Sequence, residues 1–442
     1  MARLRKIETD PRVTRIGDIC DIITSGFTPK VANLIDGDVA FVTVECVSPL
    51  QLDSSKFKRI PEADYRAGFV GRRKVTKGSI LCTIKRRIGQ AYPFLDHPDQ
   101  PLAINQDVAL LRPKPGSVTP AYLAAYLGSA IGQAFANREQ TEQMNPYLSL
   151  IGLRNLPVIV ASENVQAGIE ELLRAADALS VDVKSAMLEA EATLLTALGL
   201  AAWSPPEPLS YTARAAEAFS AARLDAQYFR PKYSEAIALL HAKGNAVELG
   251  KLVKLNSRGR QPIYADAGLP VINSKHVRTN HVNLNDDNRF GEVDKSPVVI
   301  KNGDVLLNGT GVGTIGRAAP YVFEHDALPD NHVTVIRPDQ IDPIYLSVFL
   351  NSTLGQLQIE QLIKGSSGQI ELYPDDIAKI TVWDAPSDVQ TSVRDSLLSA
   401  KALEIRSRAL LNAAKRAVEI AIEESEEAAL AYLASAGGAT NG

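Results

Sequence analysis

A chain of 442 residues is too long for one ordinary hydrophobic core, so two or three domains are expected. Its 45% hydrophobic and 22% charged residues are typical of a soluble globular protein, and no run approaches the roughly 18–20 apolar residues that cross a bilayer. The formal net charge of −4 conceals an uneven distribution, because residues 1–160 carry 21 Lys and Arg against 15 Asp and Glu.

The N-terminal sequence MARLRKIETD has no apolar stretch after its basic residues, so no signal peptide is expected. The three cysteines, Cys20, Cys46 and Cys82, have spacings that match no zinc or redox motif. These features favour a cytoplasmic location, where thiols stay reduced, and no membrane partner is expected.

Residues 1–160 are expected to form the first domain, built from short alternating strands such as residues 107–111 and followed by a short helix at about 120–135. Basic side chains gather in the middle of this domain. They could hold DNA phosphates by releasing counterions, or they could lie on a solvated surface without a ligand. They are Lys56, Lys58, Arg59, Arg66, Arg72, Arg73, Lys74, Lys77, Lys85, Arg86 and Arg87.

Residues 161–203 predict a first long helix, with Ser162 as its N-cap and Gly199 at its end. Apolar or small residues recur in steps of four and three, which is typical of a coiled-coil seam rather than of a broad globular face. The seam positions are Val165, Ile169, Leu172, Ala176, Leu179, Val183, Ala186, Ala190, Leu194 and Ala197.

Residues 204–385 are expected to hold a helical connector and a second strand-rich domain. The connector, residues 208–244, has no counterpart before the first domain, and a short helix is expected at about residues 343–358.

A second long helix is expected over residues 386–435, and it precedes a disordered tail, residues 436–442. Its seam positions are Val389, Val393, Leu397, Ala400, Leu403, Ser407, Leu410, Ala414 and Ala417.

The two strand-rich domains repeat one another in sequence, with matching segments in the same order, which indicates a tandem duplication. Matching segments are INQDVALLRP (104–113) with DNHVTVIRP (330–338), PAYLAAYLGSAIGQ (120–133) with PIYLSVFLNSTLGQ (343–356), and KGSILCTI (77–84) with NGDVLLNG (302–309). Asn105, Arg112, Asn331 and Arg337 occur in both copies, so we expect them to be framework residues. The divergent residues around them are where a difference in recognition is expected.

This layout resembles the DNA-specificity subunit of type I restriction–modification enzymes, in which target-recognition domains alternate with long helices. The similarity extends over nearly the whole chain, and its motifs are weak individually but repeated in order. They are the GDI…SG opening (Gly17 to Gly26), GTIGRAA (313–319), LDAQYFRPKY (224–233), and ENVQ and SDVQ before the two long helices. The first copy lacks the proline that the family usually has before its long helix.

The resemblance implies an α+β fold with two tandem-duplicated α/β target-recognition domains separated by two long antiparallel coiled-coil helices. It implies a non-catalytic subunit of a phage-defence system that reads double-stranded DNA with a split recognition site. S-adenosylmethionine would be bound by partner methyltransferase subunits, of which two are expected. ATP and Mg would be bound by partner restriction and translocase subunits, and none of these cofactors by this chain.

Side chains that read base edges are Arg, Lys, Asn, Gln, Ser and Thr, while basic residues also hold phosphates. In the first copy, the candidates lie in the loop after Gly26 and in a later turn; in the second copy they lie at the corresponding loops, at the glycine turn and in the polar loop 364–369. The DNA-binding candidates are Thr28, Lys30, Lys85, Arg86, Arg87, Arg258, Arg260, Gln261, Asn273, Ser274, Lys275, His276, Asn308, Thr310 and Gln369.

Two other functions stay open at this point. GVGTIG (311–316) is a literal G-x-G-x-x-G, which in a nucleotide-dependent enzyme would follow a strand and open a helix; Pro320 favours a strand-to-strand turn instead. The chain could also be a coiled-coil scaffold that binds protein rather than DNA. No catalytic residue and no metal ligands are predicted, since His276 and His281 have a spacing that does not share a helix face.

Overall fold

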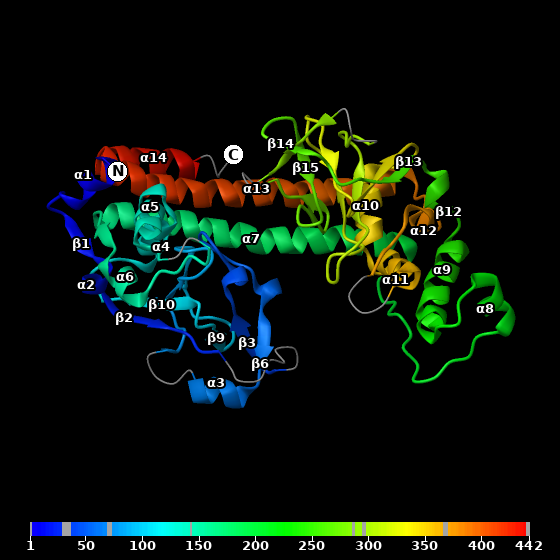
Figure 1. Ribbon diagram of the computed structural model, residues 1–442, viewed down its shortest axis with the longest axis horizontal. Helices are drawn as coiled ribbons and strands as arrows, with labels where there is room; N and C mark the ends of the chain where they lie inside the picture. The colour runs from blue at the N-terminus through cyan, green and yellow to red at the C-terminus, as the bar shows by residue number, and fades with distance from the viewer. Residues whose placement is uncertain are drawn as a thin grey trace. The chain divides into compact units, whose positions relative to one another are not determined.

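The computed structural model describes residues 2–28, 37–68, 73–141, 144–284, 288–293, 298–365 and 370–438. The chain divides into two compact units (Figure 1): unit 1 comprises Met1–Val181 and Leu403–Gly442, and unit 2 comprises Asp182–Ala402. Both units mix helices and strands. Within the described ranges, no helix combines the length and the apolar composition that crossing a membrane requires.

Unit 1 contains an antiparallel four-stranded sheet, a three-stranded sheet with one parallel pair, and two short ribbons. The four-stranded order is β2 (Cys20–Ser25), β10 (Val108–Pro113), β7 (Ile80–Thr83) and β8 (Ala91–Pro93), and the three-stranded order is β6 (Lys58–Ile60), β3 (Val39–Val42) and β9 (Leu102–Ile104). The ribbons are β1 (Val13–Arg15) with β11 (Pro157–Ile159), and β4 (Val47–Ser48) with β5 (Gln51–Leu52). The shorter helices are α1 (Ala2–Glu8), α2 (Ile16–Ile19), α3 (Glu62–Gly68), α4 (Pro120–Gly128), α5 (Ala130–Glu139) and α6 (Leu150–Asn155).

Unit 2 has a four-stranded sheet in the same order: β13 (Val253–Arg258), β22 (Val333–Pro338), β19 (Val305–Asn308) and β20 (Ala318–Pro320). Its second sheet runs β14 (Tyr264–Ala265), β18 (Phe290–Gly291), β15 (Leu269–Ile272) and β21 (Leu328–Pro329). The ribbons are β12 (Ala246–Glu248) with β23 (Thr381–Trp383), and β16 (Val277–Arg278) with β17 (His281–Val282). The shorter helices are α8 (Ala215–Ala221), α9 (Pro231–Lys243), α10 (Pro343–Asn351), α11 (Thr353–Leu362) and α12 (Pro374–Ile377).

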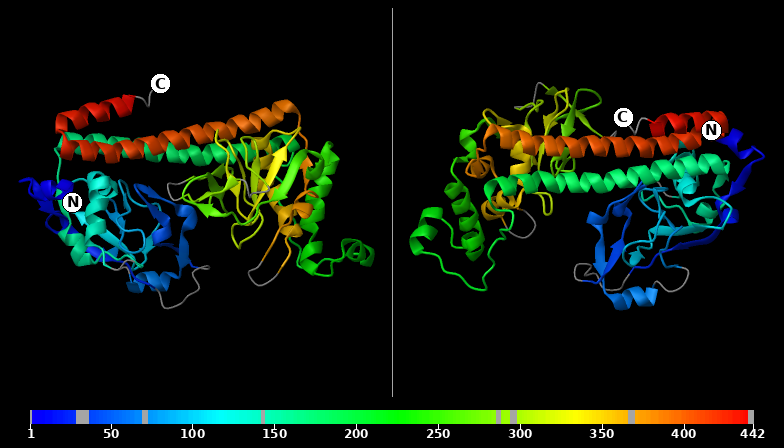
Figure 2. Two further views of the ribbon diagram at one scale, coloured as in Figure 1. Left: turned by 45° about the horizontal axis from the view of Figure 1, so that its top comes forward. Right: turned by 180° about the vertical axis from the view of Figure 1, so that it is seen from behind.

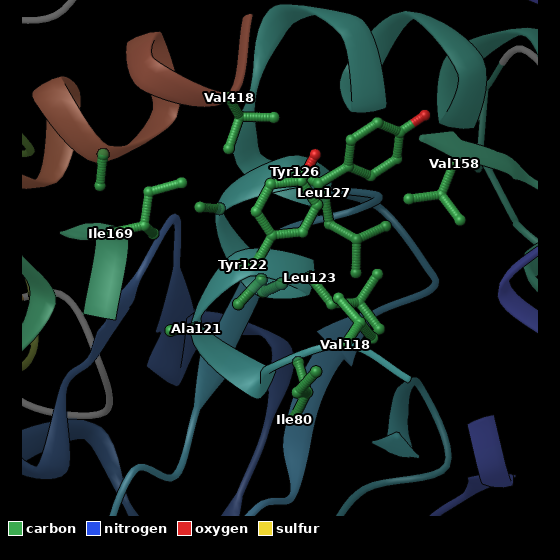
Figure 3. Close-up of a cluster of buried hydrophobic side chains, with 14 of the residues drawn as sticks. Ile80, Val118, Ala121, Tyr122, Leu123, Tyr126, Leu127, Val158, Ile169 and Val418 are labelled. Carbon is green, nitrogen blue, oxygen red and sulfur yellow. The ribbon is translucent and has the colours of Figure 1, made fainter. Parts of the chain in front are cut away.

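Strand β10 is apolar over four successive residues because it is buried on both faces. Ala109 and Leu111 face the helix-covered core of unit 1, whereas Val108 and Leu110 face the core under the three-stranded sheet. Successive strand residues point to opposite faces, so a strand buried on both sides is apolar throughout. Figure 3 shows the helix-side core, to which Ile80 of β7, Tyr122 of α4 and Ile169 of the first long helix all belong.

The single short helix expected after β10 is two helices, so that prediction is wrong in both copies. Ser129 ends α4 and starts α5, because its Oγ accepts a hydrogen bond from the N–H of Gly132 at 3.2 Å. A Cβ at Gly132 would lie 2.1 Å from the carbonyl oxygen of Tyr126, so only glycine fits this sharp bend. Ser352 makes the same break between α10 and α11 in unit 2.

The long helices are α7 (Glu163–Leu198) and α13 (Ser387–Glu423). Their predicted seam positions are all buried or half-buried. In unit 1, the first half of α7 packs on the second half of α13, where the Ser407 hydroxyl donates to the Ala176 carbonyl at 3.0 Å. In unit 2, the end of α7 shares a core with Val393 and Leu397 at the start of α13. Within each unit the two segments therefore lie side by side and antiparallel (Figures 1 and 2).

The second long helix does not continue to residue 435 as expected. It ends at Glu423, and a separate helix, α14, spans Glu426–Gly438, so residues 436–438 belong to a helix and not to a tail. The Ser425 hydroxyl accepts a hydrogen bond from the N–H of Ala428 at 3.1 Å, which starts the new helix. Residues 439–442 lie outside the described residues.

The connector has a counterpart after all, at least in its last helix. In unit 1, α1 precedes the ribbon β1–β11 and contacts α5; in unit 2, α9 precedes the ribbon β12–β23 and contacts α11. Glu8 of α1 accepts from Arg138 of α5 at 2.6 Å, and Lys232 of α9 donates to Glu360 of α11 at 2.9 Å. The expectation that residues 208–244 are unmatched is therefore wrong for α9.

Candidate nucleic-acid interface

The two arginines that occur in both copies hold equivalent turns inside the protein. Arg112 donates to the Lys74 carbonyl at 2.9 Å and to the Ser79 hydroxyl at 3.1 Å. Arg337 donates to both carboxylate oxygens of Asp304, which occupies the position of Ser79. Their prediction as framework residues is confirmed.

The match between Asn105 and Asn331 is wrong by one residue. The Asn105 Oδ1 accepts a hydrogen bond from the N–H of Asp107 at 2.8 Å, and the Asp330 Oδ1 accepts one from the N–H of His332 at 2.8 Å. The same local turn therefore uses Asn105 in unit 1 and Asp330 in unit 2. It follows that Asp107 and His332 are equivalent, although their side chains differ completely.

Asn308 and Arg87, two of the DNA-binding candidates, make structural contacts with equivalent carbonyls, but Asn308 is buried whereas Arg87 is exposed and stays a candidate. Arg87 donates from one guanidinium nitrogen to the carbonyls of Val44 and Val47, at 3.2 and 2.9 Å. The fully buried Asn308 donates to the carbonyls of Ser274 and Val277, at 3.1 and 3.4 Å. Both side chains hold the turn after the central strand of the second sheet. The prediction that Asn308 contacts DNA is wrong because the residue is enclosed.

His276 and Asn273 form that turn in unit 2, and His276 is only 2% exposed. The His276 Nδ1 accepts a hydrogen bond from the N–H of Asn273 at 3.1 Å, and burial lowers the pKa of the imidazole to about 4. In unit 1, the Cys46 Sγ accepts from the N–H of Thr43 at 3.4 Å in the same way. His276 is therefore a neutral core residue and not a DNA contact.

Most of the other candidates lie at the surface, as Arg87 does. Thr28, Arg86, Lys275, Arg260 and Gln261 are exposed, and Ser274 is half-buried. Arg86 pairs with Glu45 at 3.1 Å, and the Gln261 amide lies 3.4 Å from the Tyr264 hydroxyl. Lys30 and Gln369 lie outside the described residues.

Lys85 in unit 1 and Thr310 in unit 2 are equivalent residues, as their backbone contacts show. Lys85 forms an isolated bridge with Tyr147, and Thr310 forms one with Glu371. The Lys85 ammonium lies 3.9 Å from the Asp107 carboxylate, whereas the Thr310 hydroxyl lies 2.7 Å from the His332 Nδ1. The backbone contacts are the same, and the chemistry at the surface is different.

Ser25 and Arg258 are equivalent in the same sense, because each ends the edge strand that pairs with the central strand of its sheet. Arg258 is anchored by a hydrogen bond to the Asn331 carbonyl at 2.8 Å. Its guanidinium lies 3.7 Å from the Glu371 carboxylate and 5.7 Å from the Tyr373 ring centre. A hydrogen bond to Glu371 raises the pKa of the Tyr373 phenol.

Five equivalent positions thus surround one surface region in each unit, which we name the variable face. Each position holds a different residue in the two units. The pairs are Ser25 and Arg258, Lys85 and Thr310, Asp107 and His332, Thr141 and Lys364, and Tyr147 and Glu371. In unit 2 this face encloses a groove of about 690 Å³, lined by Thr310, Gly311, His332, Lys364, Gly365, Ile370, Glu371 and Tyr373.

Framework residues beside the variable face are identical in the two units. The Gln133 amide donates to the carbonyls of Gly89 and Leu127, at 2.9 and 2.7 Å. The Gln356 amide makes the same pair of bonds in unit 2, to Gly316 at 3.0 Å and to Leu350 at 2.7 Å. At this position the two units therefore keep the residue that positions the backbone, although the neighbouring variable face differs.

Sequence reasoning missed Asp107, Tyr147, His332, Glu371 and Tyr373. Asp107 and His332 stand directly before the repeated Val-x-x-x-Arg-Pro segments, and the match of Asn105 with Asn331, which is wrong by one residue, concealed their equivalence. The sequence could have revealed these two residues, because each is a mismatch inside segments that otherwise match. Tyr147 and Glu371 had no such signal, because the loops that carry them differ in sequence and in length.

The glycine turn joins two antiparallel strands, β19 and β20, as Pro320 indicated. The strand–turn–helix that a dinucleotide site needs is absent from the described residues 298–365, so this glycine turn lacks the context of a dinucleotide-binding fingerprint. The described part of the chain also holds no group of His, Cys, Asp and Glu side chains that could bind a metal ion.

No family model and no curated protein matches this chain. Among solved structures, it is similar to a type I restriction–modification S subunit from M. genitalium, at 11% identity and a TM-score of 0.39, with 95% of each chain covered. It is also similar to an HsdS subunit from Thermoanaerobacter tengcongensis, at 13% identity and a TM-score of 0.29, with 94% and 96% covered. A third structure, described as showing complex assembly and conformational transition of the type I R-M system, has 16% identity, a TM-score of 0.29 and 96% of each chain covered.

Proposed function

We propose that this chain is the non-catalytic DNA sequence-specificity subunit of a type I restriction–modification complex and that it reads a bipartite target. One observation carries the proposal: the two units share strand order and framework residues but differ at all five positions of the variable face. Two modules that read different half-sequences need a common scaffold and different reading residues. A repeated structural or enzymatic module gives no such reason for one surface to differ at every position.

Residues 1–160 and the strand-rich part of residues 204–385 would be the two target-recognition domains. The long helices, α7 within residues 161–203 and α13 within residues 386–435, would set the spacing between the half-sequences. Their antiparallel packing inside each unit supports this role, because a continuous helix is a rigid spacer.

A specificity subunit acts together with catalytic partner subunits. Two methyltransferase subunits would bind S-adenosylmethionine and methylate adenine after the target base leaves the duplex. Restriction and translocase subunits would supply the ATP- and Mg-dependent steps. This chain would bring them to double-stranded DNA at the split site.

The exchange of one domain tests the proposal. Residues 1–160 are replaced by the equivalent segment of a relative, and the methylated sites of cells that carry the full complex are mapped by sequencing. We expect one half-sequence to change while the other half and the spacer stay the same, because the helices are untouched. A change in both halves together would contradict a two-module reader.

The chain without its partners is the control. It should bind DNA with a strong dependence on salt and should show neither methyl transfer nor cleavage. A coiled-coil scaffold that binds only protein would show no salt-dependent DNA binding at all.

A further inference from the structure

In each variable face a cation lies beside a carboxylate, but the two ion pairs stand at different positions. In unit 1 the pair is Lys85 with Asp107, whose charged groups lie 3.9 Å apart. In unit 2 the pair is Arg258 with Glu371, 3.7 Å apart. The side chains of both carboxylates are partly exposed, at 22% for Asp107 and 39% for Glu371.

A carboxylate at this place argues against a simple phosphate-binding surface. DNA phosphates are anionic, so a site that only holds the backbone gains nothing from Asp or Glu. Base edges differ from phosphates because they also carry donors. Cytosine N4 donates to Asp or Glu, and guanine O6 and N7 accept from Lys or Arg.

A cation next to a carboxylate therefore matches a G·C pair, which presents both acceptors and a donor in the major groove. Neither carboxylate is enclosed with its cation, so both partners can exchange their mutual contact for contacts with a base pair. In unit 2 the Tyr373 ring also lies beside this ion pair, with its centre 5.7 Å from the Arg258 guanidinium. Arg258 is held by the Asn331 carbonyl and keeps its remaining N–H groups for a ligand.

We propose that Lys85 with Asp107, and Arg258 with Glu371, each read one G·C base pair, one in each half-sequence. This inference rests on the proposed function and adds the base pair and the residues that select it. Because the two pairs stand at different positions of one scaffold, the G·C pair would fall at a different place within each half-sequence.

The test replaces one carboxylate by its amide, which keeps volume and removes the charge. With Glu371→Gln in the full methyltransferase complex, methylated sites are mapped by sequencing. An amide pairs well with adenine, so we expect one G·C position in the half-sequence read by unit 2 to accept A·T as well. Discrimination at that position should fall roughly 5- to 100-fold, the range of one good base contact.

Asp107→Asn is the second variant, and it should relax one position in the other half-sequence only. Asp339→Asn is the matched control: it removes a carboxylate that pairs with Lys254 on the surface of unit 2, and it should leave the methylated sequence unchanged. The thermal unfolding of all three proteins is compared, and if Glu371→Gln does not fold, Asp107→Asn decides.

The outcomes separate the inference from the proposed function. If the wild-type complex methylates a bipartite sequence and both amide variants keep it unchanged, the base-pair assignment is wrong and the function stands. The same holds if methylation weakens uniformly at all sites, since that indicates a phosphate contact or a structural role. If the wild-type complex shows no bipartite sequence, the proposed function itself fails.

Discussion

The guanidinium of Arg337 lies against the carboxylate of Asp304, with nitrogen–oxygen distances of 2.7 and 2.8 Å. Asp304 is only 1% exposed, and the hydrogen bonds that it accepts raise the pKa of Arg337. Unit 1 builds the equivalent turn with Arg112 and the neutral hydroxyl of Ser79. One scaffold position is thus stabilised in one unit by a half-buried arginine paired with a buried carboxylate, and in the other by a neutral hydrogen bond.

Arg337→Ala should destabilise the protein more than Arg112→Ala. The first substitution leaves the Asp304 carboxylate buried without its cation, which costs about 3–5 kcal/mol in free energy of unfolding. The second removes two hydrogen bonds to neutral acceptors, at about 1–3 kcal/mol. Urea unfolding followed by circular dichroism measures both, and equal losses would contradict the role assigned to Asp304.

Arg87→Ala and Asn308→Ala should lower stability and leave the recognised sequence unchanged. Each residue donates to two backbone carbonyls of a turn, and its removal leaves those acceptors unpaired at about 1–3 kcal/mol. Arg86→Ala, at the exposed neighbour, is the control and should change stability by about 0.5 kcal/mol or less. If the methylated sequence changes while the melting temperature stays the same, the substituted residue contacts DNA and the structural role is wrong.

Leu172→Asp should disrupt the pairing of the long helices. Leu172 is 4% exposed in the core that α7 shares with α13, and burying an unpaired charge there costs several kcal/mol. Leu179→Asp should cost less, because Leu179 is only half-buried. Val181→Asp is the control on the same helix, since Val181 is 63% exposed. The melting temperature and the recovery of the methyltransferase complex are measured. Equal effects of the Leu172 and Val181 substitutions would show that Leu172 is not buried between the long helices.

His276 should make unit 2 less stable in mild acid. Burial holds the pKa of His276 at about 4 in the folded protein, while an unfolded chain takes up the proton below about 6.5. The unfolded state therefore binds more protons as the pH falls, and stability is lost from pH 6.5 downward. Between pH 7 and pH 5 the loss from this residue should be about 2 kcal/mol.

His276→Cys installs the residue that unit 1 has at this position, and a cysteine does not titrate in that range. The variant should lose about 2 kcal/mol less than the wild type between pH 7 and pH 5, measured by urea unfolding at both values. The same pH dependence in both proteins would mean that His276 is protonated in the folded state.

Local patterns in the sequence were sufficient for the regular elements and for the repeat. Apolar positions in steps of four and three predicted the buried faces of α7 and α13, because those steps place side chains on one side of a helix. The pattern around Arg112 and Arg337 identified the scaffold, because the turn that each arginine holds lies at the same distance along the chain in both copies.

The variable face was decided by the tertiary structure. Lys85, Asp107 and Tyr147 come from three separate segments of unit 1, which hydrogen bonds bring together. The same backbone hydrogen bonds in unit 2 show that Thr310, His332 and Glu371 are the equivalent residues. Likewise, Arg87 and Asn308 stand at different places in the two repeats, yet each donates to the equivalent carbonyls of its own unit. Sequence spacing measures distance along the chain, whereas a binding surface depends on distances across it, which exist only once the strands have paired.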